Sequence, residues 1–420
     1  MSAAPRASAL APFKVRSFRF QWPADLATSW AFEMETLILG WYVLVETRSV
    51  LMLTIFASLQ YSGNLLAPMV GVMADRLGHR NVLCAMRSAY VVFSSTLMVL
   101  SFAGALAPTY VLLMAGVMGM VRPSDTGIRS ALVGMTMPGD SLVGAMSIQR
   151  TTQDTARIAG ALSGAGLMAW LGMGPAYALV VCLYVTSVLL TLKAGSQHSI
   201  SNSAVEKTPV TRPSPWRELR EGVTYAWHTP HVRAVMLLAL MLNMTAFPLF
   251  GGLLPYVAKE VYHANQTMLG YMVATAASGA LTGSIILSRF GSTIQPARMM
   301  IVFCVMWYSM LIVFAQMQHP PEGILCLFLA GLSQSLGQVP MAALLLRNSD
   351  ARFRGRIMGI RMLAIYSNVP GLLLAAPLIS RFGYSATAAL YCVTGITVTL
   401  LIAVHWRSHL LRGDAPANRQ

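Results

Sequence analysis

The chain has 420 residues, of which 55% are hydrophobic and only 11% are charged. Ordinary soluble domains contain about 25% charged residues, so this chain cannot cover its surface with polar groups, and we do not expect a soluble enzyme. Its basic excess, 30 Lys and Arg against 15 Asp and Glu, raises the question of nucleic-acid binding, which depends on where the basic residues lie.

Twelve apolar runs are long enough to cross the hydrocarbon core of a bilayer, which takes about 20 residues of helix. They cover residues 20–46, 50–73, 82–104, 108–130, 142–170 and 174–193, and then 232–256, 265–288, 298–317, 322–346, 357–380 and 384–405. The sequence therefore predicts an all-α membrane protein with twelve transmembrane helices. The tail before the first run has no clear cleavage site, so we expect the first helix to be retained.

The long polar stretch at 194–231 divides the runs into two bundles of six, which we expect to span residues 1–193 and 232–420. The stretch begins as a Ser- and Pro-rich linker. It ends in a segment where apolar residues recur at helical spacing opposite charged ones: Trp216, Leu219, Val223 and Trp227 against Arg217, Glu218, Arg220 and Glu221. This pattern predicts an interfacial helix on the cytoplasmic surface.

Basic residues collect on one side of the predicted bundle. Of the 30, 25 fall in the two tails, in the loops that follow even-numbered runs, or at the helix ends beside those loops. The exceptions are Arg48, Lys259 and Arg381 on the opposite side, and Arg122 and Arg157 inside helices. By the positive-inside rule both termini are cytoplasmic, in the inner (plasma) membrane. The basic excess is then explained without a nucleic-acid partner.

An internal repeat supports the division into halves. A shift of 211 residues lays Gly144, Arg150, Gly160, Leu167 and Gly172 on Gly355, Arg361, Gly371, Leu378 and Gly383. The fifth predicted helix therefore corresponds to the eleventh. Repeats of this kind are typical of secondary transporters.

The loop between the second and third runs carries the most specific local motif, GVMADRLGHR at residues 71–80. Asp75 can accept hydrogen bonds from a neighbouring helix N-terminus, and Arg76 and Arg80 can anchor the cytoplasmic side. The motif resembles the G-x-x-x-D-R-x-G-R-R loop of the major facilitator superfamily, with His79 in place of one basic residue. The simpler alternative is an ordinary short basic loop.

Other segments are similar to the enterobactin-exporter and macrolide-efflux branch of that superfamily. They are residues 18–22, 40–44, 157–160 and 354–359, and the resemblance covers most of residues 14–405. It implies the major facilitator fold and exporter-like transport, and it does not name a substrate.

Ionisable residues at membrane depth need a partner or a task, because each costs about 2.5–3.5 kcal/mol at a helix centre. The proton-coupling candidates are Glu33, Glu35, Asp25 and Asp125, since a carboxyl group in a low-dielectric cavity binds a proton more readily than one in water. Glu33 and Glu35 lie about 200° apart around a helix. We therefore expect at most one of them to carry the proton, with Asp125 and Arg122 as switching partners. The alternative is a static buried ion pair.

A second group of charges, Arg150, Asp154 and Arg157, shares one face of the fifth predicted helix because the spacings are four and three. The carboxylate can then be held between two guanidiniums. With Arg361, the repeat partner of Arg150, this group is expected to form a gate. Arg157 lies deeper and is also a candidate for binding an anionic group of a substrate.

Substrate contacts are expected from aromatic and Met side chains along the first, fourth, seventh and tenth runs. The candidates are Trp30, Phe32, Trp41, Asn243, Phe247, Phe250, Gln334 and Gln338. The sequence has no Walker A motif, no dinucleotide fingerprint and no Cys–His spacing typical of a metal site, so we expect neither a metal nor another cofactor, and no ATPase.

These patterns predict a secondary transporter that exports small amphiphilic molecules of siderophore or drug type in exchange for protons. We expect a monomer in the lipid bilayer, with the two bundles rocking about a central cavity. Proton-coupled uptake is the first alternative, because the fold does not set direction. A membrane sensor or scaffold that does not transport is the second, and a membrane-embedded enzyme ranks third.

Overall fold

The computed structural model describes residues 11–65, 67–194, 215–290, 295–347, 360–361 and 364–408. All regular secondary structure in these residues is helical. The predicted all-α class is therefore confirmed.

The helices follow the predicted apolar runs closely. The first part contains η1 (Ala11–Lys14), α1 (Arg16–Thr47), α2 (Val50–Leu59), η2 (Ser62–Leu65), α3 (Ala67–Leu77), α4 (His79–Phe102), α5 (Pro108–Thr136), α6 (Gly139–Leu171) and α7 (Met173–Lys193). The second predicted helix is thus broken at η2. The other ends differ from the predicted ones by a few residues, because polar end residues continue helices beyond the apolar run.

The remaining elements begin with the helix predicted at the interface. They are α8 (Pro215–His228), α9 (Pro230–Phe247), η3 (Pro248–Gly252), α10 (Leu254–Tyr256), η4 (Val257–Val261), α11 (Gln266–Phe290), α12 (Pro296–Gln316), α13 (Pro320–Arg347), η6 (Ile365–Ser367), α15 (Asn368–Phe382) and α16 (Tyr384–His405). Of these, η3 and η4 are π-helical. The beginning of the eleventh predicted helix lies largely outside the described residues.

Within the described part of the chain, seven helical stretches are long and apolar enough to cross a membrane by length and composition. They are α4, α7, α9 together with η3, α11, α12, α13 and α16. The helices α1, α5 and α6 are longer still, but their ionisable residues lower their hydropathy. These three helices therefore miss the criterion through composition and not through length.

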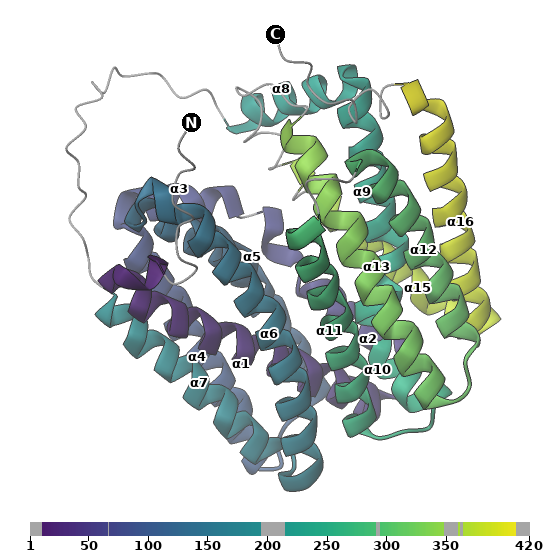
Figure 1. The fold of residues 1–420 in the computed structure, drawn as a ribbon. Coiled ribbons are helices and arrows are strands. Elements are labelled where there is room, and N and C mark those ends of the chain that lie inside the picture. Colours follow the sequence, from purple (N-terminus) through teal and green to yellow (C-terminus); the bar gives the residue numbers. More distant parts are fainter. Residues whose placement is uncertain are drawn as a thin grey trace. The chain divides into compact units, whose positions relative to one another are not determined.

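The chain divides into two compact units. Unit 1 contains residues 1–39 and 62–211, and unit 2 contains residues 40–61 and 212–420. In unit 1, α4 packs along α7 and beside α5 (Figure 1). In unit 2, α13 packs against both α11 and α12, and α2 packs against α15. The domain limits predicted from the linker, at residues 193 and 232, remain a prediction.

The repeat predicted from the sequence has a counterpart in the backbone. Gly172 ends α6 with φ 84° and ψ −177°, and Gly383 ends α15 with φ 81° and ψ 169°. This region of the backbone map is open essentially to glycine alone. The two turns are 211 residues apart and have the same conformation, as the predicted pseudo-symmetry requires.

Close helix crossings repeat in the two units as well. A methyl group added at Gly160 of α6 would lie 3.0 Å from the carbonyl oxygen of Trp30, and one at Gly371 of α15 would collide with the carbonyl oxygen of Met244. Small residues allow such contact between helix backbones. Trp30 and Met244 are 214 positions apart, which relates α1 to α9.

Candidate functional site

A polar core runs through unit 1 between α1, α4, α5 and α7. Each of these helices contributes side chains three, four or seven residues apart, which places them on one face. They are Gln21, Asp25, Thr28 and Glu35; Arg87, Tyr90 and Ser94; Arg122, Asp125 and Arg129; and Tyr177, Tyr184, Ser187 and Thr191. All buried acidic and basic side chains of the described residues belong to this core. The charge inside the membrane is therefore concentrated in unit 1.

Glu35 lies at one centre of this core and has no exposed surface. Its Oε1 accepts hydrogen bonds from Ser94 Oγ at 2.8 Å and Tyr177 OH at 3.3 Å. Its Oε2 accepts one from Tyr184 OH at 3.1 Å and an ion-paired one from Arg122 Nη2. Four side chains from three other helices therefore fix the position of this carboxylate.

Arg122 is fixed from several directions. Its guanidinium carbon lies 3.9 Å from the ring centroid of Phe32, which is within cation–π range. Its Nη1 lies 3.5 Å from Thr36 Oγ1, and its Nη2 lies 3.4 Å from Tyr184 OH. The next residue, Pro123, has no backbone N–H, and it lies inside α5. The arginine therefore sits where the helix ladder is already interrupted.

A second cluster contains two acids and two bases in alternation. Arg87 is ion-paired with Asp25, and Arg129 is ion-paired with Asp125 one turn away on α5. Across these pairs, Arg129 Nε lies 3.7 Å from Asp25 Oδ1, and Arg87 Nε lies 3.9 Å from Asp125 Oδ1. The four charges cancel, so the cluster is neutral although it is buried.

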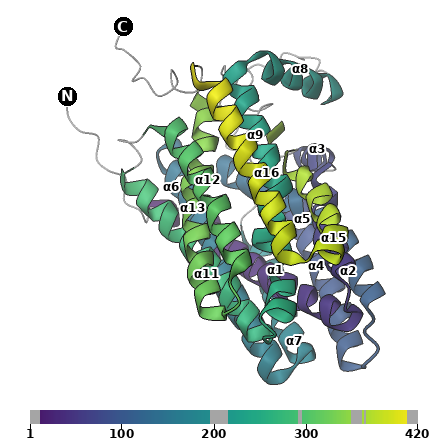
Figure 2. The ribbon, with the colours of Figure 1, turned by 90° about the vertical axis from the view of Figure 1, so that its right-hand side faces the viewer.

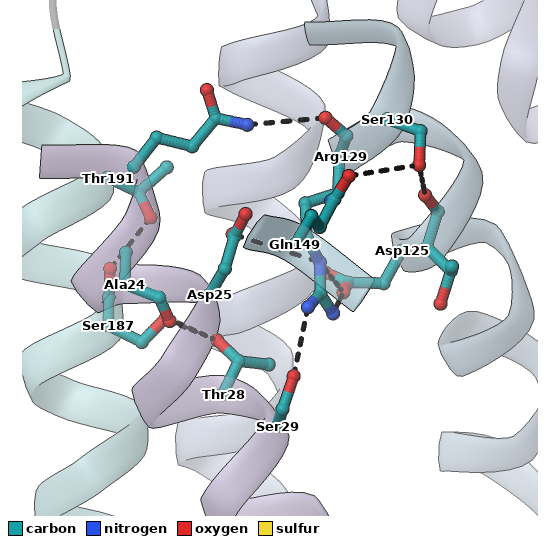
Figure 3. A network of polar contacts seen from close by, with 12 residues as sticks. Ala24, Asp25, Thr28, Ser29, Asp125, Arg129, Ser130, Gln149, Ser187 and Thr191 are labelled. Atoms are coloured by element: carbon teal, nitrogen blue, oxygen red, sulfur yellow. Dashed lines mark hydrogen bonds and ion pairs between the residues drawn. The ribbon is translucent and has the colours of Figure 1, made fainter. Parts of the chain in front are cut away.

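Polar neighbours complete this cluster. Arg129 Nη1 donates to Ser29 Oγ at 2.9 Å (Figure 3). The carbonyl oxygen of Arg129 accepts from Gln21 Nε2 at 3.2 Å. Arg87 Nη1 donates to Thr191 Oγ1 on α7. Buried ion pairs are retained only with such additional bonds, and the arrangement is typical of a structural tie between helices.

Glu33 points to a different neighbour from Glu35, as their spacing on α1 requires. Its Oε2 lies 3.9 Å from Arg157 Nε on α6. The side chain of Glu33 is 25% exposed and that of Arg157 is 38% exposed, whereas the Glu35 side chain has no exposed surface. Glu33 is therefore partly exposed in this conformation, whereas Glu35 is enclosed.

Two predicted partnerships differ from the structure. Asp125 lies one turn from Arg122 along α5, and its ion-pair contacts in the described residues are with Arg129 and Arg87 in the cluster of Asp25. Asp154 lies 3.5 Å from Arg150, but the ion pair of Arg157 is with Glu33. The long Arg157 side chain reaches the neighbouring helix, so among the described residues Asp154 has one ion-pair contact within 4 Å, with Arg150.

The sequence reasoning missed Arg87 and the two tyrosines that bind Glu35. Arg87 was expected among the basic helix ends, yet it lies eight residues inside α4 and has no exposed surface. Arg129, which the sequence places at membrane depth beside Arg122 and Asp125, is buried inside α5. The signal that could have found these residues is the recurrence of polar side chains at helical spacing within apolar runs. Tyr177 and Tyr184 are seven residues apart, and so are Arg87 and Ser94.

The predicted gate residues have separate environments. Arg80 donates from Nε to the carbonyl oxygen of Thr191 at 3.3 Å and from Nη2 to that of Leu192, so it caps the end of α7. Arg76 is exposed at the end of α3. The side chain of Asp75 lies outside the described residues. Arg361 is half-buried beside a segment that is not described, and the gating role of these residues remains a prediction.

The predicted substrate contacts in unit 2 are largely packed into its core. The rings of Phe247 and Phe250 meet the fully buried Trp307 edge-on, with centroids 5.2 and 5.6 Å away. Asn243 Nδ2 donates to the carbonyl oxygen of Ala239 on its own helix. Gln334 and Trp41 are buried, and Gln338 is half-buried.

The candidates in unit 1 lie beside the charged residues. Trp30 Nε1 donates to Ser163 Oγ at 2.8 Å, which ties α1 to α6. Phe32 packs under Arg122. Both side chains are half-buried. Substrate binding by any of these residues remains a prediction.

Comparisons with known proteins agree with this architecture. The sequence profile described as Major Facilitator Superfamily matches residues 27–369. No protein with a curated description matches the chain significantly.

Solved transporters share the fold at low sequence identity. A bacterial homologue of the human lysosomal transporter Spinster, in an inward-facing and unoccupied conformation, has a TM-score of 0.75 and 11% identity over 96% of this chain and 99% of its own. The POT family transporter PepTSo has a TM-score of 0.71 and 14% identity over 95% and 99%. A D-xylose-proton symporter has a TM-score of 0.68 and 12% identity over 92% and 97%. At these identities the likeness is one of fold.

Proposed function

This chain belongs to the major facilitator superfamily, whose profile matches it over residues 27–369, and we propose that it is a proton-coupled exporter of small amphiphilic molecules. Its two halves alternate in exposing a binding site to the two sides of the membrane. The observation that carries the proton coupling is the buried pair of Glu35 and Arg122 in unit 1.

Protons and Arg122 compete for the same carboxylate. When Glu35 takes up a proton it loses its negative charge, and Arg122 is left without its ionic partner. An uncompensated arginine at a helix centre costs about 2.5–3.5 kcal/mol on insertion scales. Proton binding therefore favours another conformation, in which the guanidinium meets water or an anion. Such a difference in affinity between two states is what couples a ligand to a conformational change.

Glu33 supplies the route for protons within the same proposal. Its separation of 3.9 Å from Arg157 exceeds a hydrogen-bond distance, and its side chain is partly exposed. Glu33 can exchange protons with water while Glu35 is closed off. Because Glu33 is partly exposed and Glu35 is buried, replacing each one singly separates the role of accepting a proton from that of switching the conformation.

An amphiphilic cargo is supported by composition. The chain has 28 methionines and 37 aromatic residues counted as Phe, Trp and Tyr, and flexible thioethers adapt to varied apolar shapes. The resemblance of residues 18–22 and 40–44 to siderophore and macrolide exporters favours export. Uptake in the same coupled manner is the alternative, because gradients set the direction.

The test is proton movement in proteoliposomes that contain a pH-sensitive dye and have an imposed pH gradient. Ethidium and an iron-free catecholate siderophore serve as amphiphilic probes. We expect Glu35→Gln to abolish probe-driven proton movement, and Glu33→Gln to slow it. The matched control is Glu46→Gln, an exposed glutamate on the same helix, which should leave coupling intact. Full coupling in both of the first two variants would rule out this mechanism.

A further inference from the structure

One guanidinium joins three helices at an end of unit 2. The Arg233 guanidinium carbon, on α9, lies 5.6 Å from the ring centroid of Trp227 on α8 and 5.2 Å from that of Trp406, directly after α16. Both distances are within cation–π range. Figure 2 shows α8 across the end of α9, with α16 packed along α9. We call these three residues the Trp–Arg–Trp corner.

The indole faces hold Arg233 but leave its donors unused. An arginine has five N–H donors, and a ring face engages the charge without occupying them. The Arg233 side chain has no hydrogen-bond or ion-pair partner among the residues that the structure describes, and its Nε is buried without one. A guanidinium that is fixed in place with free donors is prepared for an oxyanion.

The pseudo-symmetric position in unit 1 makes the contrast clear. Arg19 of α1 is 214 residues before Arg233, the same separation that relates Trp30 to Met244 at the helix crossings. Arg19 Nε donates to the carbonyl oxygen of Phe13 at 2.6 Å, and its Nη2 donates to that of Lys14 at 3.4 Å. The segment before α1 thus satisfies this arginine, whereas α8 presents an indole to its counterpart.

The surroundings of the corner combine basic charge with exposed apolar surface. Arg407 is exposed next to Trp406, and His228 is exposed next to Trp227. Trp227 is 60% exposed and Val223, one turn earlier on α8, is 47% exposed. Tryptophan beside basic residues is typical of the boundary between lipid and water.

From these contacts we propose that the Trp–Arg–Trp corner binds the phosphate group of an anionic phospholipid. The planar guanidinium fork of Arg233 matches phosphate oxygens in pairs, and Arg407 adds a second positive charge. A lipid is the source rather than a soluble phosphate, because its chains cover Trp227 and Val223. Free phosphate would leave that apolar surface in water.

The experiment measures how brominated lipids quench tryptophan fluorescence. The full-length protein is reconstituted in phosphatidylcholine with an equal fraction of brominated phosphatidylglycerol or brominated phosphatidylcholine. We expect stronger quenching by the anionic lipid. Trp227→Phe and Trp406→Phe, made separately, should each reduce this excess, which assigns it to the corner among the eight tryptophans of the chain.

Substitutions of the arginine separate lipid binding from a merely structural contact. Arg233→Gln should lose the excess quenching, and Arg233→Lys, which keeps the charge without the fork, should lose part of it. Arg298→Gln, an exposed arginine of α12, is the matched control and should keep the excess. Circular dichroism and gel filtration in detergent identify any variant that fails to fold. If Arg233→Gln fails to fold, the quenching of Arg233→Lys decides whether Arg233 binds the lipid.

Two outcomes would overturn the proposal. Equal quenching of the unaltered protein by both lipids would show that the corner does not select anionic lipid, and an excess that survives Arg233→Gln would remove Arg233 from the site. Inorganic phosphate is added against chloride at matched ionic strength. We expect it to leave the excess unchanged, and displacement by phosphate would assign the corner to a soluble anion instead.

Discussion

The buried pair of Glu35 and Arg122 should show a large coupling energy in a double-mutant cycle. Glu35 has no exposed surface, and the Arg122 side chain is 11% exposed. Breaking a buried ion pair from one side costs about 3–5 kcal/mol, because the other charge stays buried alone. We therefore expect Glu35→Gln and Arg122→Gln each to reduce the free energy of unfolding by that amount. The double variant should lose less than the sum by about 2–3 kcal/mol.

The pair of Glu33 and Arg157 provides the comparison within the same unit. Its nitrogen and oxygen are 3.9 Å apart, and both side chains are partly exposed. Ion pairs in contact with solvent contribute about 0.2–1 kcal/mol. The cycle made from Glu33→Gln and Arg157→Gln should accordingly give a coupling energy within that range.

The assay is equilibrium unfolding in mixed micelles of a mild detergent and dodecyl sulfate, followed by circular dichroism. All variants are compared at one pH and one salt concentration, because exposed charges are screened by salt. Equal coupling energies for the two pairs, or a larger one for Glu33 and Arg157, would refute the argument that burial sets the strength of these contacts.

Two further predictions concern glycines. Gly371→Ala should lower the free energy of unfolding by about 1–3 kcal/mol, because the added methyl group would collide with the carbonyl oxygen of Met244. Gly166→Ala is the control: no atom lies within 4 Å of its added carbon, so the same assay should show no change. Gly172→Ala should cost about 1–3 kcal/mol because its φ of 84° strains any other residue; a thermal midpoint unchanged from the native protein would contradict that reading of the turn.

The concentration of charge in unit 1 gives the two units different tasks in the proposed cycle. The described buried polar side chains of unit 2 are uncharged, among them Thr245, Ser333 and Asn368. In unit 2, Thr245 Oγ1 and Tyr308 OH form a neutral hydrogen bond of 2.7 Å. A proton can change the electrostatics of unit 1 far more than those of unit 2, so we expect coupling residues in unit 1 alone.

The sequence by itself determined the helices, because the bilayer sets the length and polarity of a spanning segment independently of its neighbours. The apolar runs at 174–193 and 384–405 match α7 and α16 almost residue for residue. The opposed directions of Glu33 and Glu35 also followed from helix geometry alone. The helix predicted near residues 216–227 is present as α8, and its interfacial position remains a prediction.

Only the tertiary structure decided which charges meet. Glu35 binds donors that are 59 to 149 residues away in the chain, and nothing in a single helix specifies how it is rotated against the next. The sequence predicted Arg87 at a basic helix end, but the packing of α4 against α1 places it beside Asp25. The spacing of residues along a helix determines the face on which a side chain lies. Which faces of two helices meet depends on how the whole helices pack, for example where α6 crosses α1 at Gly160.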